Sequence, residues 1–113
     1  MADADPTPDA QREVELTLVT MEFRTAKPEA LMPVLAKYVV LSRGHDGCRN
    51  IDLCASVTTP NRFVLIEKWD SAEAQRVHFD SPEMVEMAEA CAGRLARPPV
   101  IDLLEGISAH DLA

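Results

Sequence analysis

Three side chains in the second half of the sequence could act on a small molecule. Glu67 and Trp69 lie two residues apart in the apolar run 62–69, and His78 follows in a segment with helical spacing. Alternate residues of a strand point to the same face, so the Glu67 carboxylate and the Trp69 indole would share one side of a sheet. A carboxylate, an imidazole with a pKa near 6.5 and an aromatic wall suit the binding and deprotonation of a ring. His78 and Glu67 are therefore candidate catalytic residues, and Trp69 is a candidate substrate-binding residue.

Each of these side chains also has an ordinary structural explanation. A Trp at the end of a strand can belong to a core, and a carboxylate beside it can hold a structural hydrogen bond. A histidine can pack against or cap a helix. His78 shares its helical face with Ala74, Val77 and Ser81, which would turn the imidazole inward. Both interpretations stay open on the sequence alone.

Other polar side chains are less informative. Asn50 and Asp52 share one face of a predicted strand, so they are candidate substrate-binding residues, although they could equally line a contact between subunits. His45 falls in a predicted loop and His110 in a predicted tail, and the sequence gives neither a role. The chain has no GxGxxG motif and no residues with the spacing of metal ligands, so we expect neither a metal nor another cofactor.

The composition restricts the class of protein. A chain of 113 residues that is 47% hydrophobic has room for one hydrophobic core. The formal net charge of -8 repels phosphate backbones and anionic lipids, so neither nucleic acid nor a membrane is expected as a partner. The apolar runs are too short for a membrane span, and the first residues lack the features of a signal peptide. We expect a cytoplasmic protein.

The three cysteines agree with a reducing compartment. Cys48 and Cys54 fall on one predicted strand, where ~3.3 Å per residue separates them by about 20 Å, too far for a disulfide. Cys91 falls on a predicted helix. We expect all three to be buried as small hydrophobic residues, with an intermolecular disulfide or a reactive thiol as the alternative.

The pattern of apolar residues predicts four strands and two or three helices. Alternation predicts strands at 14–24, 48–57, 63–69 and 100–107, and the turn signal at 59–62 joins the second and third as a hairpin. Helical spacing predicts a helix from Pro28, which Pro33 would either shorten to begin near Glu29 or kink. Asp70 and Glu73 have the spacing of a capping box that would begin the next helix. A further helix from Ser81-Pro82 would carry the apolar stripe Met84, Val85, Ala88, Cys91, Ala92 and Leu95.

This order of elements, β-α-β-β-α(α)-β, predicts an α+β protein of the ferredoxin-like kind, a four-stranded antiparallel sheet with helices on one face. Residues 13–108 would form the domain, between a disordered acidic tail at 1–12 and a short tail at 109–113. The strands are apolar on both sides, which is typical of a sheet covered on both faces. A second copy of the chain is the commonest cover, so we expect a homodimer.

Several short motifs occur in a definite order along the chain. Gly47-Cys48 begins a strand, the run 62–69 forms another, and the segment 72–78 precedes Ser81-Pro82. Pro98-Pro99 then comes before the last strand. Together these motifs resemble the antibiotic biosynthesis monooxygenase (ABM) domain over about residues 14–107.

The resemblance implies a dimeric α+β barrel with a pocket in each subunit between the sheet and the helices. Some members of that family oxidise quinols or polycyclic phenols with molecular oxygen and use neither metal nor flavin, and members often carry a His at the position of His78. The resemblance therefore favours a cofactor-free monooxygenase that acts on a quinol or a related small aromatic compound.

Other activities of the resembled family have to be weighed. Haem-degrading members use an Asn, a Trp and a His at places that here hold Val19, His78 and Met87, so haem degradation is not expected. An isomerase acting on a sugar phosphate and a non-catalytic dimeric module that binds a small ligand remain the alternatives.

Overall fold

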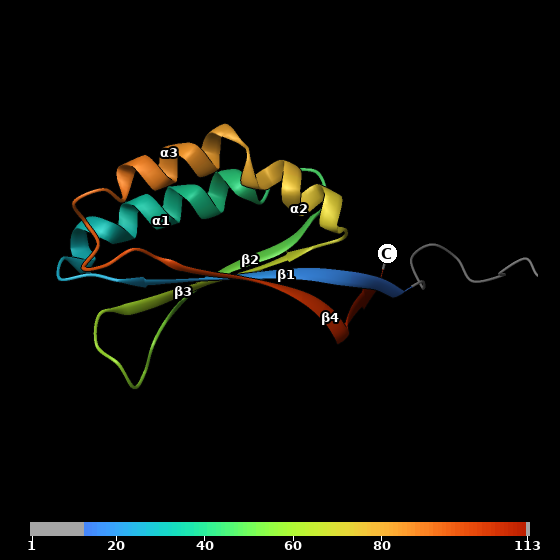
Figure 1. Ribbon diagram of the computed structural model, residues 1–113, viewed down its shortest axis with the longest axis horizontal. Helices are drawn as coiled ribbons and strands as arrows, with labels where there is room; N and C mark the ends of the chain where they lie inside the picture. The colour runs from blue at the N-terminus through green and yellow to red at the C-terminus, as the bar shows by residue number, and fades with distance from the viewer. Residues whose placement is uncertain (1–12, 113) are drawn as a thin grey trace, which may run out of the picture.

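The structure is a computed structural model that describes residues 13–112. Its elements are β1 (Glu13–Arg24), α1 (Pro28–Ser42), β2 (Cys48–Ala55), β3 (Arg62–Trp69), α2 (Ala72–Phe79), α3 (Pro82–Ala90) and β4 (Val100–Leu112). The strands form one antiparallel sheet in the order β2-β3-β1-β4, and the helices lie over one of its faces (Figure 1). This confirms the predicted ferredoxin-like α+β fold. The predicted tail at 1–12 lies outside the described residues.

The core lies between the helices and the sheet. Every second residue of β1 and β3 points toward the helices, and the two strands pair so that Met21 lies opposite Leu65 and Val19 opposite Glu67. The helices α1 and α3 close over these strands with their apolar sides. The resulting core consists of Val19, Met21, Phe23, Leu31, Leu35, Tyr38, Val39, Ile51, Leu65, Trp69, Met84, Met87 and Cys91.

Two strand ends differ from the prediction. β2 stops at Ala55, and Val57, predicted to be the last residue of this strand, is 98% exposed. β4 does not end at Ile107 but continues to Leu112, and its last residues pair with Glu13 to Glu15 of β1. The register between β1 and β4 shifts between Glu15 and Thr17, which lets β4 bend and then pair again (Figure 1). Residues 109–112, predicted as a tail, therefore belong to the sheet.

Two helix boundaries differ from the prediction, and the start of the first helix agrees with it. The residue that caps α2 is Ser71, whose side chain accepts a hydrogen bond from the Ala74 amide, rather than Asp70. α3 ends at Ala90, well before Leu95. Its buried residues are Met84 and Met87, whereas Val85, predicted on the apolar stripe, is 50% exposed. α1 begins at Pro28 and continues through the exposed Pro33, so this proline neither delays nor divides the helix.

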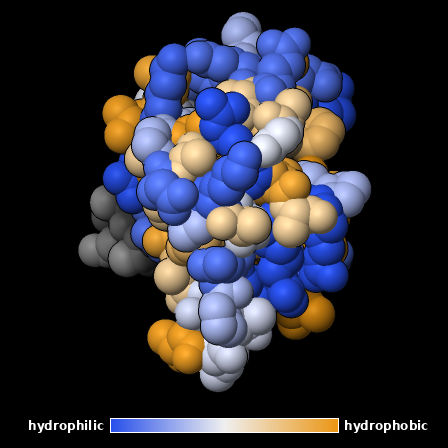
Figure 2. All heavy atoms as spheres, turned by 90° about the vertical axis from the view of Figure 1, so that its left-hand side faces the viewer, coloured by the Kyte–Doolittle hydropathy of each residue, from blue (hydrophilic) through white to orange (hydrophobic). Residues whose placement is uncertain are grey.

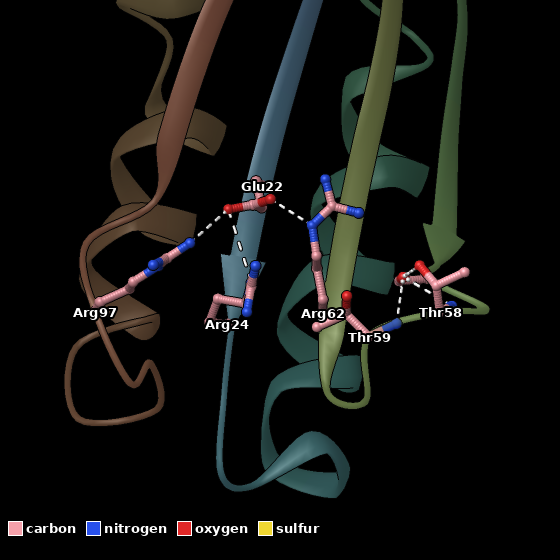
Figure 3. A network of polar contacts seen from close by, with 7 residues as sticks. Glu22, Arg24, Thr58, Thr59, Arg62 and Arg97 are labelled. Carbon is pink, nitrogen blue, oxygen red and sulfur yellow. Dashed lines mark hydrogen bonds and ion pairs between the residues drawn. The ribbon is translucent and has the colours of Figure 1, made fainter.

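The face of the sheet opposite the helices is called the open face here. It carries half-buried or exposed apolar side chains such as Ile66 and Leu104, together with a group of charged residues at one end. There the Glu22 carboxylate is bound by Arg62 and Arg97 and lies 3.8 Å from Arg24 (Figure 3). The hydrogen bonds from the two guanidinium groups lower the pKa of Glu22. Three arginines around one glutamate make this end of the open face positive although the chain as a whole is acidic.

The cysteines agree only in part with their predicted burial. All three are free thiols, and Cys91 is buried, Cys48 half-buried and Cys54 exposed on the open face. Burial raises the pKa of Cys48 and of Cys91, which keeps both as neutral thiols. Within residues 13–112 no helix is long and apolar enough to span a membrane.

Gly47 provides a test of the turn that leads from α1 into β2. Its φ of +82° is a conformation that side chains disfavour, and an added Cβ would collide with Ala74 and lie 2.7 Å from Asp70 Oδ1. Gly93 has a similar φ of +77° with open space around it. We expect Gly93→Ala to lower the free energy of unfolding by about 1 kcal/mol and Gly47→Ala by about 2 kcal/mol or more, measured by urea denaturation. Equal losses of unfolding free energy in the two variants would show that the close approach of α2 to Gly47 does not affect stability.

Candidate functional site

Glu67 is a buried carboxylate on the helix side of the sheet. Its side chain is 1% exposed and lies between Leu65 and Trp69 along β3. The Tyr38 hydroxyl of α1 donates a hydrogen bond of 2.6 Å to Oε2, and the Trp69 indole N–H donates one of 3.0 Å to Oε1. Both donors are neutral groups. Burial raises the pKa of Glu67 more than these two hydrogen bonds lower it.

His78 of α2 packs against Trp69 and Tyr38, the two side chains that donate hydrogen bonds to Glu67. Its imidazole stacks on the Trp69 indole with ring centroids 4.5 Å apart and an interplanar angle of 30°, and its Nε2 lies 2.8 Å from the Tyr38 oxygen. The side chain is 2% exposed. Burial, followed by the neighbouring His45, lowers the pKa of His78 to about 4. The folded protein therefore holds a neutral His78 at pH 7.

The structure brings His45 into this site, although no functional role was predicted for it. The residues after α1 turn back sharply, since the His45 amide bonds to the Ser42 carbonyl and the Cys48 amide bonds to the His45 carbonyl. This turn puts His45 Nδ1 3.1 Å from Nδ1 of His78, with the two rings nearly perpendicular. His45 Nε2 lies 2.9 Å from Oε1 of Glu83 at the start of α3.

These contacts form a continuous series that we call the polar row: Glu67, Tyr38, His78, His45 and Glu83. Sequence reasoning identified only two of its members, Glu67 and His78. Tyr38 has the helical spacing of an ordinary core residue, and His45 and Glu83 lie 38 residues apart with no shared motif. No local signal in the sequence connects them, because the row exists only once three helices and a loop have packed on the sheet.

Trp69, predicted to bind the substrate, lies under His78 and is fully buried, so one face of its indole is already occupied by the imidazole. Asn50 and Asp52 are not brought to the polar row. They pair across the sheet with Lys68 and Ile66, whose side chains point away from the helices, and Asn50 donates a hydrogen bond of 3.0 Å to Asp52. Both therefore lie on the open face, where a role at a subunit contact stays a prediction.

Two hollows lie between the helices and the β1–β4 edge, and no residue of the polar row lines either of them. The first, the end cavity, has a volume of about 410 Å³ and an almost wholly apolar lining that includes Met21, Phe23, Met84, Met87, Cys91 and Ile101. Its rim is formed by the segment after α3, at the end of the molecule that faces the viewer in Figure 2, where hydrophobic side chains show among hydrophilic ones. The second, the α2 hollow, is also about 410 Å³ and is lined by Ala72, Gln75, Arg76, Phe79 and Leu103. A smaller hollow of about 220 Å³ between α1 and α3 includes Tyr38 and Glu83 in its lining.

The two hollows are neighbours along β4 and approach the polar row. Ile101 of the end cavity and Leu103 of the α2 hollow are alternate residues on one face of the strand. Leu103 pairs with Val19, and Val19 pairs with Glu67 on its other side. Gln75 lies one helical turn before His78 on α2. A molecule lying along this face of β4 would therefore be one side-chain layer from the row.

This arrangement combines an apolar site of the size of a small aromatic compound with buried groups that can exchange a proton. The neutral His78 and the carboxylate of Glu67 are both able to accept a proton, and the polar side chains that contact them belong to Tyr38, Trp69 and His45. Perturbed titratable groups beside an apolar hollow are typical of binding or catalytic sites. Within residues 13–112 no three His, Cys, Asp or Glu side chains are placed to hold a metal ion.

Comparisons with known proteins agree with the fold. The sequence profile of the family "Antibiotic biosynthesis monooxygenase" matches residues 16–90. The solved structure of Rv0793 from Mycobacterium tuberculosis is 26% identical, with a TM-score of 0.77 over 83% of this chain and 97% of that one. A proposed antibiotic biosynthesis monooxygenase from Caulobacter crescentus is 20% identical, with a TM-score of 0.76 over 83% of this chain and 92% of that one.

A conserved protein from Methanosarcina mazei is 14% identical, with a TM-score of 0.77 over 82% of this chain and 94% of that one. The last two comparisons show the shared fold alone. A search of curated proteins finds no match to the sequence.

The lowered pKa of His78 predicts how stability depends on pH. Between pH 6.5 and about 4 the unfolded chain binds a proton at this residue that the folded protein does not, so stability falls as the pH falls through this range. His78→Phe keeps a ring against Trp69 but cannot titrate. We expect the wild type to lose about 2 kcal/mol of unfolding free energy relative to His78→Phe between pH 7 and pH 4.5.

Urea denaturation at the two pH values measures this difference. Val77→Ala, a change on the same helix at a residue that is 60% exposed, should follow the wild type. If the unfolding free energies of the wild type and His78→Phe differed by the same amount at both pH values, His78 would have an unshifted pKa in the folded protein.

Proposed function

The chain belongs to the antibiotic biosynthesis monooxygenase family, and from this premise we propose that it is a monooxygenase that oxidises a quinol or a related small phenol with molecular oxygen. The observation that carries the proposal is the buried polar row, with Glu67 and the neutral His78, next to apolar hollows on the β1–β4 side. A buried carboxylate without a cationic partner costs stability, and function is the usual reason for keeping one.

The substrate would lie along the inner face of β4, in the hollows that Ile101 and Leu103 line. Methionines form part of the wall toward the core, and these flexible side chains can repack around rings of different shape. The ring hydroxyl would point toward α2, where Gln75 lines the hollow and His78 follows one turn later. In this placement the hydroxyl proton passes to the polar row and is taken up at Glu67, His78 belongs to the row through which it leaves, and Trp69 holds the imidazole rather than the substrate.

The reaction needs no external electron donor. A phenol that has lost its O–H proton transfers one electron to oxygen, and the resulting ring radical and superoxide combine to form a C–O bond. The proton held by the base returns to the outer oxygen of the peroxide, and the O–O bond breaks. The outer oxygen leaves as water together with the hydrogen of that ring carbon, and the inner oxygen stays as a carbonyl. In total, one phenol with a ring C–H and one O₂ give one quinone and one water, and four electrons pass from the ring to oxygen. The protein's task is to bind the ring, remove the proton and exclude bulk water.

Oxygen uptake tests the proposal. The purified protein should consume oxygen well above the rate of autoxidation with at least one member of a panel of benzohydroquinones, naphthohydroquinones and polycyclic phenols. His78→Phe should lower this rate at least tenfold, about 1.4 kcal/mol in the barrier, because the polar row is interrupted while the ring packing is kept. Val77→Ala is the matched control and should leave the rate unchanged.

The products decide between oxygenase and oxidase chemistry. With ¹⁸O₂, one labelled oxygen atom should appear in the quinone and one in water. No uptake across the panel, combined with saturable binding of the same compounds, would instead favour a module that binds a ligand without turnover, which the apolar lining of the end cavity also suits. An uptake that His78→Phe does not change would remove His78 from the mechanism.

We also propose that the protein acts as a homodimer formed through the open face. Leu104 is 47% exposed there and pairs with Leu18, so an apolar strip on this face is not covered by any other part of residues 13–112. Leu104→Glu would put a charge in the centre of the contact and should convert a dimer into a monomer, measured by sedimentation equilibrium. Val57→Glu, at a 98% exposed loop residue, should leave the dimer intact. A wild-type monomer at high concentration would contradict the proposal.

A further inference from the structure

The polar row connects the most deeply buried carboxylate to the surface. Successive contacts run from Glu67 to Tyr38 (2.6 Å), from Tyr38 to His78 (2.8 Å), from His78 to His45 (3.1 Å) and from His45 to Glu83 (2.9 Å). The exposure rises along the series, from 1% at Glu67 to 25% for the His45 side chain and 28% for that of Glu83. Every junction is within hydrogen-bond distance, and each inner member can both donate and accept.

The positions of the protons follow from these contacts when Glu67 is ionised. Tyr38 donates to Glu67 and must therefore accept a hydrogen bond from Nε2 of His78. Nδ1 of His78 then carries no proton and accepts from Nδ1 of His45. Nε2 of His45 faces a carboxylate, which can only accept, so it is protonated as well. In this outward arrangement His45 is an imidazolium between His78 and Glu83.

A second arrangement contains the same number of protons. The Nδ1 proton of His45 passes to Nδ1 of His78, the Nε2 proton of His78 passes to the Tyr38 oxygen, and the Tyr38 proton passes to Oε2 of Glu67. Three N–H or O–H bonds break and three form, with no change in net charge. In this inward arrangement Glu67 and His45 are both neutral, and no heavy atom has to leave its place.

The surroundings favour His45 and Glu67 over His78 and Tyr38 as the residues that hold the transferred proton. Burial disfavours an imidazolium at His78, whose pKa is about 4, and a tyrosinate at Tyr38, whose pKa is raised. Burial favours the neutral form of Glu67, whereas the hydrogen bonds from Tyr38 and Trp69 favour its ionised form. The Cys48 thiol of β2 also faces Tyr38 and Glu67, but burial raises its pKa, so it stays neutral.

From this geometry we infer that Glu67, Tyr38, His78, His45 and Glu83 form a proton relay, through which the surface pair His45–Glu83 controls the protonation of the buried Glu67. The use of this relay rests on the proposed function: a proton taken from the substrate at Glu67 would leave through His45 without opening the core to water. The relay itself does not depend on any activity. It adds His45 and Glu83 to the functional residues, as groups that act through others.

Glu83→Gln tests the relay through the sign of its effect on Glu67. A direct electrostatic effect would lower the pKa of Glu67, because the variant removes a negative charge. The relay predicts the opposite. Without the Glu83 carboxylate the His45 imidazolium is less stable, so the proton moves inward and Glu67 becomes more protonated. We expect the ratio of the outward to the inward arrangement to fall about tenfold, because the variant removes the negative charge next to the His45 imidazolium of the outward arrangement.

Nuclear magnetic resonance of the protein without substrate measures this shift. The ¹⁵N signals of the histidine rings identify the tautomers, and the ¹³C signal of the Glu67 carboxyl reports its protonation. At pH 7 the wild type should show His45 protonated on both nitrogens and His78 protonated on Nε2. Glu83→Gln should move His78 toward the Nδ1 tautomer and Glu67 toward its neutral form. Glu86→Gln, which removes the same charge from the same helix outside the row, should change neither.

Interrupting the row provides the second measurement. Tyr38→Phe removes the bridging hydroxyl, so adding Glu83→Gln to it should still change His45 but no longer shift Glu67. The relay is wrong if His45 is neutral in the wild type, or if Glu83→Gln leaves Glu67 unchanged or makes it more acidic. It is also wrong if Glu67 responds equally with and without Tyr38. Because no substrate is present, a protein without oxygenase activity could still pass or fail this test.

Discussion

The burial of one carboxylate is the constraint on which the candidate site depends. Glu67 lies on the apolar side of the sheet, where an unpartnered polar group would cost several kcal/mol. Its hydrogen bonds from Tyr38 and Trp69 offset part of that cost, and they fix where α1 must lie over β3. Tyr38 in turn sets the position of His78, since the hydroxyl contacts both residues. The packing of two helices on the sheet is therefore linked to the protonation of a single side chain.

The asymmetry of the sheet has a similar consequence for function. α1 and α3 pack on the inner side with Leu35, Tyr38 and Met87, whereas Leu103 on the inner face of β4 is 59% exposed and borders a hollow. The side chains that could exchange protons are sealed next to this half-covered strand. Under the proposed function, a substrate would bind against apolar surface while the charged intermediates of proton transfer stay away from bulk water. The candidate site depends on both features together. An apolar hollow alone, or a buried row of polar side chains alone, would not indicate a reaction.

The local patterns of the sequence were sufficient for most of the fold. Alternation along β1 and β3 and the turn at 59–62 gave the antiparallel sheet, because these signals depend on residues that are close in the chain. The errors lie where tertiary contacts override such signals. α3 ends at Ala90 although apolar residues continue to Leu95, and β4 runs past Ile107 because β1 offers it a partner. Ser71 caps α2 because its hydroxyl, and not the Asp70 carboxylate, reaches the Ala74 amide.

For the site, the sequence by itself determined that Glu67 and Trp69 share a face and that His78 turns inward, because strand and helix periodicities fix the direction of a side chain. It could not determine what those side chains meet. Tyr38, His45 and Glu83 come from α1, the loop after it and α3. Tyr38 and His45 contact His78, Glu83 contacts His45, and these contacts span up to 40 residues of chain. Only the packed tertiary structure decides which hydrogen-bonding groups lie 3 Å apart, because that distance depends on the docking of whole helices and not on any local spacing.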